Sequence, residues 1–324
     1  MHKNKIVSII GTGVIGAGWA ARFIASGYYV QAYDPNPKSL KKLKVDVKKA
    51  LTSLKKIGLN NNASIKNLSL FSNLNDALNK TSFVQENAPE NEKLKTSLLK
   101  KIDSLLDRKI LIASSSSGLL PTKIQSQCKN PSRVLIGHPF NPVYLLPLVE
   151  IVKGKKTSQQ SALKLKKIYL DIGMKPLMVR KEIEGYISDR LQEALWRESL
   201  HLIKDGIAST EEIDDAIVYG PGLRWAFMGV CLTFHLAGGN EGMKHMLEQF
   251  GPALKLPWTK LKAPELDKNL KNKMIVGTKK QAGKFSINDL EKQRDKFLIE
   301  IMKTLNNNQN NKFPNWSTKY NNFK

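Results

Sequence analysis

The chain has 324 residues, of which 41% are hydrophobic, and this is enough for about two domains with cores of their own. Its net charge of +24, from 52 Lys and Arg against 28 Asp and Glu, would suit a polyanionic partner. The lysines, however, are spread over helix-like segments such as residues 38–49 and are not interleaved with aromatics. A solvated helix face explains such a segment, so neither nucleic acid nor a membrane surface is expected as a partner.

The cysteines and the amino terminus indicate the compartment. Cys128 and Cys231 are far apart and lack the spacing of a metal site or a redox pair, so neither a disulfide framework nor a bound metal is expected. The amino terminus runs directly into a strand-like segment, and no apolar stretch is long enough to cross a bilayer. The sequence therefore predicts an unsorted, cytoplasmic protein.

Residues 5–34 follow the order strand, tight turn, helix and strand. The first glycine of the turn allows the chain to reverse, the second lets the backbone approach a pyrophosphate, and the third permits close packing of helix on strand. An acidic residue that ends the second strand would hydrogen-bond the adenosine ribose and repel a 2′-phosphate, which favours NAD over NADP. The predicted cofactor-binding residues are Gly11, Gly13, Val14, Ile15, Gly16 and Asp34.

The chain continues to alternate between strands and helices as far as residue 179. Helix-like periodicity separates the further strand-like segments, which lie at residues 68–71, 81–85, 110–113, 134–137, 148–152 and 175–179. Such alternation is typical of a doubly wound sheet. From residue 187 on, helical periodicity dominates, beginning with Ser188–Lys204 and a capping box at Ser209 with Glu212.

These patterns predict an α/β protein with an N-terminal Rossmann-type doubly wound sheet followed by an all-helical C-terminal domain. The expected domains are residues 1–184, which carry the dinucleotide-binding turn, and the helical residues 185–305. Residues 306–324 form a polar, low-complexity tail.

His138 and Glu150 lie on consecutive strand-like segments. A neutral imidazole can take a proton near neutral pH, and a carboxylate on its other nitrogen fixes the tautomer and stabilises the imidazolium. The two residues are therefore interpreted as a base and its orienting partner.

In this order, the motifs resemble the 3-hydroxyacyl-CoA dehydrogenase family over nearly the whole chain. The matching motifs are Gly11–Gly16 with Asp34, Pro89–Asn91 with Lys95, Ala113–Ser117, and Gly137–Pro142 with Glu150. The resemblance implies that His138 takes a hydroxyl proton as hydride leaves carbon for NAD, and that Ser117 hydrogen-bonds the alcohol or the developing carbonyl oxygen. Further residues near the nicotinamide end would be Glu90, Lys95 and Asn141.

One position departs from the acyl-CoA members, since Asp189 stands where their long helix opens with an asparagine beside the substrate. A negative charge there suits a cationic substrate better than a CoA thioester. The second half is most similar to the family members that oxidise L-carnitine. Aromatic faces would hold the trimethylammonium group of that substrate. The implied substrate residues are Ser117, Asp189, Trp196, Arg224, Trp225 and Phe227.

Three functions stay open on the sequence. The first is NAD-dependent oxidation of the 3-hydroxyl of L-carnitine to 3-dehydrocarnitine, and the second is the same chemistry on a 3-hydroxyacyl-CoA or on L-gulonate, as in lambda-crystallins. The third is a binding or structural protein that has lost turnover, against which the intact His138, Glu150 and Ser117 argue. The resemblance also implies a homodimer built on the helical domain.

Overall fold

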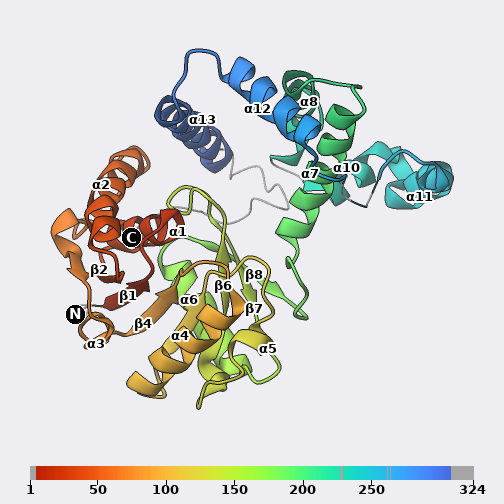
Figure 1. Ribbon diagram of the computed structural model, residues 1–324. Helices are drawn as coiled ribbons and strands as arrows, with labels where there is room; N and C mark the ends of the chain where they lie inside the picture. The colour runs from red at the N-terminus through yellow and green to blue at the C-terminus, as the bar shows by residue number, and fades with distance from the viewer. Residues whose placement is uncertain (1–4, 227–228, 261, 263, 308–324) are drawn as a thin grey trace. The chain divides into compact units, whose positions relative to one another are not determined.

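The computed structural model describes residues 5–226, 229–260, 262 and 264–307. The chain divides into two compact units, and the boundary between them falls after Asp189 (Figure 1). This lies beyond the boundary expected after residue 184. Tyr186 is buried, and the amides of Ile187 and Ser188 bond to Glu150, so this short segment belongs to the first unit.

The first unit is built on a sheet of eight strands in the order β3-β2-β1-β4-β5-β6-β7-β8. All neighbours run parallel except β6 and β7, which are antiparallel. The strands are β1 (Ile6–Ile10), β2 (Tyr29–Tyr33), β3 (Leu68–Phe71), β4 (Phe83–Glu86), β5 (Leu111–Ser114), β6 (Val134–Pro139), β7 (Leu148–Val152) and β8 (Lys175–Val179). The order reverses direction between β1 and β4, which is the switch point at which open α/β sheets bind ligands.

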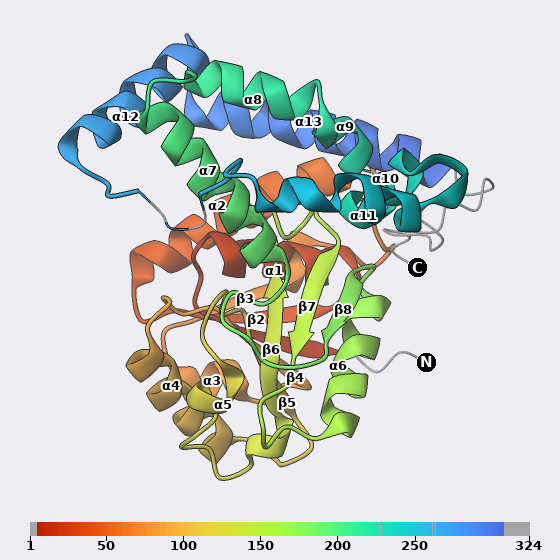
Figure 2. The same ribbon diagram turned by 90° about the vertical axis from the view of Figure 1, so that its right-hand side faces the viewer.

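Helices cover both faces of this sheet, with α4 and α6 on opposite sides (Figure 2). Helices α1 and α6 share a face, because Trp19 of α1 stacks on Tyr169 of α6 with ring centroids 5.2 Å apart. The helices of this unit are α1 (Val14–Ala25), α2 (Pro37–Leu54), α3 (Leu74–Leu78), α4 (Glu92–Leu105), α5 (Pro121–Ile124) and α6 (Gln159–Asp171).

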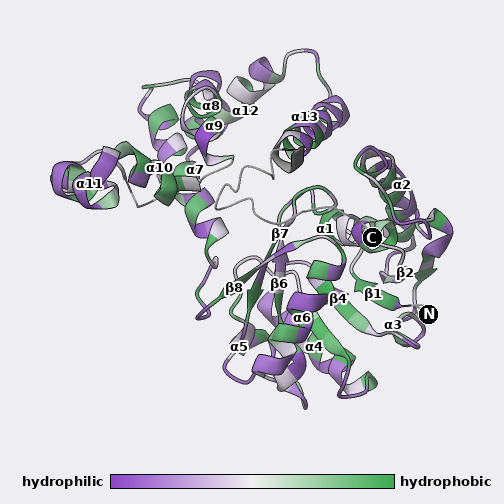
Figure 3. Cartoon of the chain, turned by 180° about the vertical axis from the view of Figure 1, so that it is seen from behind, coloured by the Kyte–Doolittle hydropathy of each residue, from purple (hydrophilic) through white to green (hydrophobic). Residues whose placement is uncertain are grey.

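The core of the first unit lies between the sheet and these helices. Strands β4, β5 and β6 are buried along their whole length, and strand β1 carries the hydrophobic colour in Figure 3. Burying one large aliphatic side chain contributes about 1.5–3 kcal/mol to the stability of the fold. A sheet with both faces covered is therefore a rigid support for the loops at its carboxyl edge.

In its described residues the second unit contains helices and the segments that connect them, and no strand, which confirms the predicted fold class. Its helices are α7 (Ser188–Lys204, which begins in the first unit), α8 (Thr210–Val218), α9 (Pro221–Trp225), α10 (Gly229–Ala237), α11 (Met243–Phe250), α12 (Lys268–Ala282) and α13 (Ile287–Asn307). The predicted capping box is present at the start of α8, where Ser209 and Glu212 bond reciprocally. Residues 308–324 of the predicted tail lie outside the described residues.

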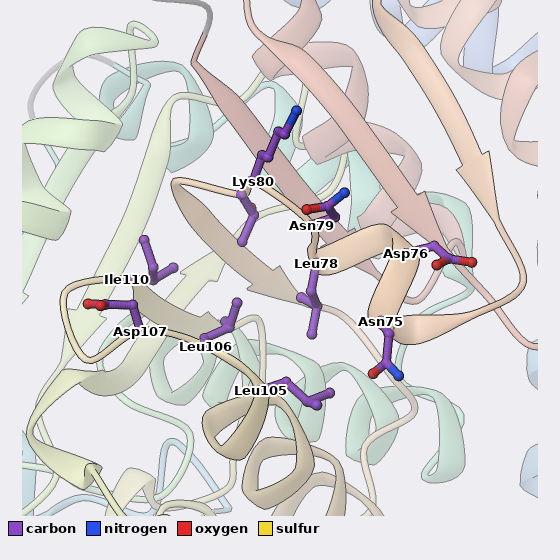
Figure 4. Close-up of a pocket in the computed structure, with 10 residues that line it drawn as sticks. Asn75, Asp76, Leu78, Asn79, Lys80, Leu105, Leu106, Asp107 and Ile110 are labelled. Carbon is purple, nitrogen blue, oxygen red and sulfur yellow. The ribbon is translucent and has the colours of Figure 1, made fainter.

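A pocket of about 490 Å³ lies at the far end of the strands from the site described below. Figure 4 shows that its lining comes from α3, from the end of α4 and from the segments that follow them. Thr81 precedes β4 and Ile110 precedes β5, so the pocket is at the amino-terminal ends of these strands. It is therefore separate from the edge on which the predicted catalytic residues lie.

None of the helices in the described part of the chain combines the length and the apolar character that a membrane crossing requires.

Candidate active site

Only glycine fits at Gly11 in the turn after β1 and at Gly16 in the first turn of α1. Gly11 has a φ of +91°, and a Cβ there would lie 2.7 Å from the backbone carbonyl of Asn87. A Cβ on Gly16 would lie 2.0 Å from the carbonyl oxygen of Gly11. The glycine spacing thus follows from a turn that is packed closely against β4 and against the first turn of α1.

The amino terminus of α1 is open to an anion. Gly13 is its N-cap and offers no side-chain cap, the first turn holds no acidic residue, and a Cβ on Gly13 would meet nothing within 4 Å. Val14 in this turn is 60% exposed, and Ile15 is half-buried. Free amides at a helix amino terminus attract negative charge, so this cradle fits the pyrophosphate of a dinucleotide.

Asp34 follows β2 and is fixed beside the same turn. Its Oδ2 accepts hydrogen bonds from the amide and the hydroxyl of Thr12, at 3.1 and 2.9 Å, and its Oδ1 accepts one from the amide of Asn36 at 2.9 Å. The structure therefore brings the predicted ribose-binding carboxylate to the glycine-rich turn. Sequence reasoning missed Thr12, although a hydroxyl residue between the first two glycines was a visible signal.

Glu90 lies in the loop after β4 and organises the loop after β5. Its Oε1 accepts hydrogen bonds from the hydroxyl of Ser116 and from the amides of Ser117 and Gly118, the latter two at 3.0 and 3.1 Å. Burial raises the pKa of Glu90, but these hydrogen bonds and the charge of Lys95 outweigh burial, so the pKa lies below its ordinary value. Glu90 is thus an ionised anchor for the loop that carries Ser117.

Lys95 points into the protein, with a side chain that is 1% exposed. Its ammonium donates to both carboxylate oxygens of Glu86, at 2.9 and 3.1 Å, and to the carbonyl of Ala88 at 2.9 Å, while Glu90 lies 3.6 Å away. A buried charge needs such partners. Through its bonds to Glu86 and Ala88, Lys95 stabilises the loop that contains Glu90. Contact between Lys95 and a cofactor stays a prediction. Sequence reasoning missed Glu86, a carboxylate at the end of a fully buried strand.

His138 and Glu150 face each other across β6 and β7. They are paired in the antiparallel register, and Nδ1 of His138 lies 3.0 Å from Oε2 of Glu150. Oε1 of Glu150 accepts the amides of Ile187 and Ser188 at 3.0 and 3.1 Å. Burial raises the pKa of Glu150, but the bonds from His138 and from the two amides outweigh it and lower the pKa below its ordinary value.

The ring of His138 is held on several sides. It is 5% exposed and makes edge contacts with Phe140 and Tyr186, with ring centroids 5.1 and 5.5 Å apart. Nε2 lies 3.7 Å from Oδ2 of Asp189. An ionised Glu150 beside Nδ1 favours the tautomer with its proton there, which leaves Nε2 with a lone pair. The arrangement can accept a proton at Nε2 and stabilise the imidazolium that results.

The remaining predicted residues are distributed over both units. Asn141 is exposed just beyond the end of β6, on the same edge as His138. Trp196, Arg224 and Trp225 belong to the second unit, where Trp196 is 47% exposed and Trp225 is half-buried. Phe227 lies outside the described residues. Their roles toward a substrate stay predictions.

Comparison with known proteins matches both halves of the chain to family models. Residues 6–183 match the NAD binding domain of 3-hydroxyacyl-CoA dehydrogenase, and residues 185–286 match the C-terminal domain of the same family. The predicted cofactor, NAD, is thereby confirmed, and it fits the open helix terminus at Gly13 and the carboxylate of Asp34.

Individual relatives agree with this assignment over almost the full length. The chain is 51% identical to L-carnitine dehydrogenase of Bacillus cereus, over 94% of each chain, and 50% identical to that of Oceanobacillus iheyensis, over 92% of this chain and 97% of that one. Among solved structures, 5-formyl-3-hydroxy-2-methylpyridine 4-carboxylic acid 5-dehydrogenase is similar, with a TM-score of 0.77 and 25% identity over 93% of this chain and 98% of that chain. The chain belongs to the 3-hydroxyacyl-CoA dehydrogenase family.

Proposed function

We propose that the protein is an NAD-dependent dehydrogenase that oxidises the 3-hydroxyl group of L-carnitine to give 3-dehydrocarnitine. The observation that carries this proposal is the identity of about half of all residues, over more than nine-tenths of the chain, with proteins named L-carnitine dehydrogenase. The paired His138 and Glu150 at the carboxyl edge of the sheet support it, because an alcohol oxidation needs a positioned base.

NAD would be held by the open amino terminus of α1 and by Asp34, and it would supply the acceptor for the hydride from the carbon that bears the hydroxyl. Nε2 of His138 takes the hydroxyl proton, and Glu150 stabilises the imidazolium through Nδ1. Ser117 is assigned a hydrogen bond to the reacting oxygen, from a loop that Glu90 holds in place. Because Glu150 already accepts two backbone amides, it stays oriented while the charge on His138 changes.

Asp189 supports a cationic substrate over an acyl-CoA. Its carboxylate lies 3.7 Å from Nε2 of His138, so it adds negative charge at the place where the hydroxyl must bind. That charge attracts a trimethylammonium group and repels an acyl-CoA, which is anionic. We assign the ammonium to the aromatic residues Trp196 and Trp225, and the substrate carboxylate to Arg224, on chemical grounds.

The proposal is tested by following NADH formation with L-carnitine, 3-hydroxybutyryl-CoA and L-gulonate side by side, at matched concentrations of enzyme and NAD. The highest kcat/KM is expected for L-carnitine. The family models make 3-hydroxyacyl-CoA oxidation the second candidate, and a higher kcat/KM for 3-hydroxybutyryl-CoA would establish that candidate instead.

Exchange of Asp34 for alanine should relax the preference for NAD over NADP. The change removes a negative charge that would face the extra phosphate, and also an acceptor for the ribose hydroxyls. Loss of one charge-assisted hydrogen bond costs about 1.5–3 kcal/mol, so kcat/KM with NAD should fall roughly 10-fold or more. The ratio of kcat/KM with NADP to kcat/KM with NAD should therefore rise. Equal kcat/KM for the two cofactors in the unmodified protein would refute the role of Asp34.

A homodimer built on the helical unit is part of the proposal. Large apolar side chains of this unit are exposed, among them Ile207 at 71%, Leu236 at 67%, Leu254 at 85% and Trp258 at 70%. Exposed apolar side chains of this size favour burial against a partner, and a second copy with two-fold symmetry is the usual one. Light scattering at micromolar concentration should give twice the mass of 36.4 kDa. A monomeric mass under these conditions would overturn this part of the proposal.

A cytoplasmic location also remains a proposal. Cys128 and Cys231 are both free thiols, as suits a reducing compartment. Burial raises the pKa of Cys128 to about 12, so this thiol stays protonated and unreactive at neutral pH.

A further inference from the structure

Tyr186 lies between β8 and α7 and is held in an unusual backbone conformation. Its side chain is 0% exposed, and its φ of +47° falls in the left-handed region, directly after Gly185 with a φ of +69°. A bulky side chain is disfavoured there, so its contacts must hold it in place. Such conformations cluster at functional sites, and the contacts of Tyr186 show what this one accomplishes.

The backbone conformation of Tyr186 directs two amides toward Glu150. The two left-handed residues turn the chain so that the next two amides, of Ile187 and Ser188, point at Oε1 of Glu150 from 3.0 and 3.1 Å. Helix α7 begins at Ser188, so the positive end of its dipole also faces this carboxylate. A change in the turn would release Glu150 from two of the bonds that orient it.

The side chain of Tyr186 contacts His138 and the loop after β5. Its ring contacts the imidazole of His138 at a centroid distance of 5.5 Å and an interplanar angle of 60°. Its hydroxyl donates to the carbonyl oxygen of Leu119 at 2.8 Å, and the amide of Leu119 in turn donates to the hydroxyl of Ser116. One residue therefore joins His138, Glu150 and the loop that carries Ser117.

We propose that Tyr186 is a positioning residue for the hydride-transfer reaction, which sets the orientation of the His138–Glu150 pair relative to the Ser117 loop. It acts through the pair, with its ring against His138 and the amides that follow it on Glu150. The inference rests on the proposed role of His138 as the base.

The test is a double-mutant cycle between Tyr186 and Glu150, with kcat measured per folded enzyme in the full-length protein. Tyr186→Leu should lower kcat roughly 10- to 100-fold, because small misplacements of reacting groups have effects of this size, with KM for NAD unchanged. In the Glu150→Gln background the same change should lower kcat less than about 2-fold, since the effects of substitutions at residues that act as a unit are not additive. Tyr186→Phe, which keeps the ring, should stay within about 3-fold of the unmodified kcat.

Tyr28→Leu is the matched control for the loss of a buried tyrosine. Tyr28 is 7% exposed, contacts Phe23 at a centroid distance of 5.3 Å and precedes β2, at the amino end of the sheet. The Tyr28→Leu variant should have a lower melting temperature than the unmodified protein and an unchanged kcat. Tyr186→Met is studied in parallel, so that the cycle does not depend on the folding of one variant. An equal loss of kcat in both backgrounds would overturn the role of Tyr186, whereas full activity of Glu150→Gln alone would overturn the proposed base pair itself.

Discussion

Replacing His138 with alanine should lower kcat for L-carnitine oxidation by roughly 10²–10⁴, the usual effect of removing a positioned acid or base. Nδ1 of His138, near the carboxyl end of β6, is paired with the buried, ionised carboxylate of Glu150 on the antiparallel strand β7, and Nε2 is left to accept a proton. Cofactor binding should not change, because the glycine-rich turn and Asp34 lie on other strands.

The measurement pairs steady-state kinetics with a fluorescence titration of NADH. The dissociation constant for NADH should stay within about 3-fold of the unmodified value, because cofactor contacts that are not made by His138 are retained. A variant that keeps more than a tenth of kcat would show that another residue takes the proton. Loss of NADH binding together with kcat would instead show a structural role for His138.

Replacing Glu150 with glutamine should also lower kcat by roughly 10²–10⁴, because an orienting carboxylate fixes the tautomer of its histidine and stabilises the imidazolium. Glutamine can present its amide nitrogen to Nδ1 of His138, which favours the tautomer with the proton on Nε2. The amides of Ile187 and Ser188 keep an acceptor, so the fold around the site should survive.

The same carboxylate makes a pH-dependent contribution to stability. The pKa of Glu150 is lower in the folded protein than its ordinary value, so its contribution is fully present above the unfolded pKa of about 4.3 and is lost as the pH falls through the folded pKa. The difference in unfolding free energy between the unmodified protein and Glu150→Gln should therefore narrow on acidification below about pH 4. Denaturant unfolding at a series of pH values measures this, and a difference that grows toward low pH would contradict the assigned shift.

Strand positions could be predicted from the sequence because buried strands are short apolar runs bounded by turn residues. The direction of β7 was not predicted, although only residues 140–147 connect it to β6. A parallel crossover needs a dozen or more residues, so this link permits an antiparallel pair only. The short helices α3 and α5 were also missed, since four or five residues carry little periodicity.

The His138–Glu150 pair could be predicted because both residues lie on neighbouring strands with a short link between them. Three other features depend on contacts between segments that the sequence does not relate. These are the bonds from Thr12 to Asp34, the burial of Lys95 against Glu86, and the left-handed Tyr186. Each requires the positions of the strand ends in the sheet, so only the folded chain reveals them.

The most direct test of the proposed reaction follows the hydrogen that leaves the substrate. L-carnitine that carries deuterium on carbon 3 is incubated with the enzyme and NAD, and the NADH formed is analysed by mass spectrometry. Because His138 takes only the hydroxyl proton, the deuterium should appear in NADH in a one-to-one ratio with the 3-dehydrocarnitine produced. NADH without deuterium, or no NADH from L-carnitine under conditions in which 3-hydroxybutyryl-CoA is oxidised, would contradict the proposed reaction.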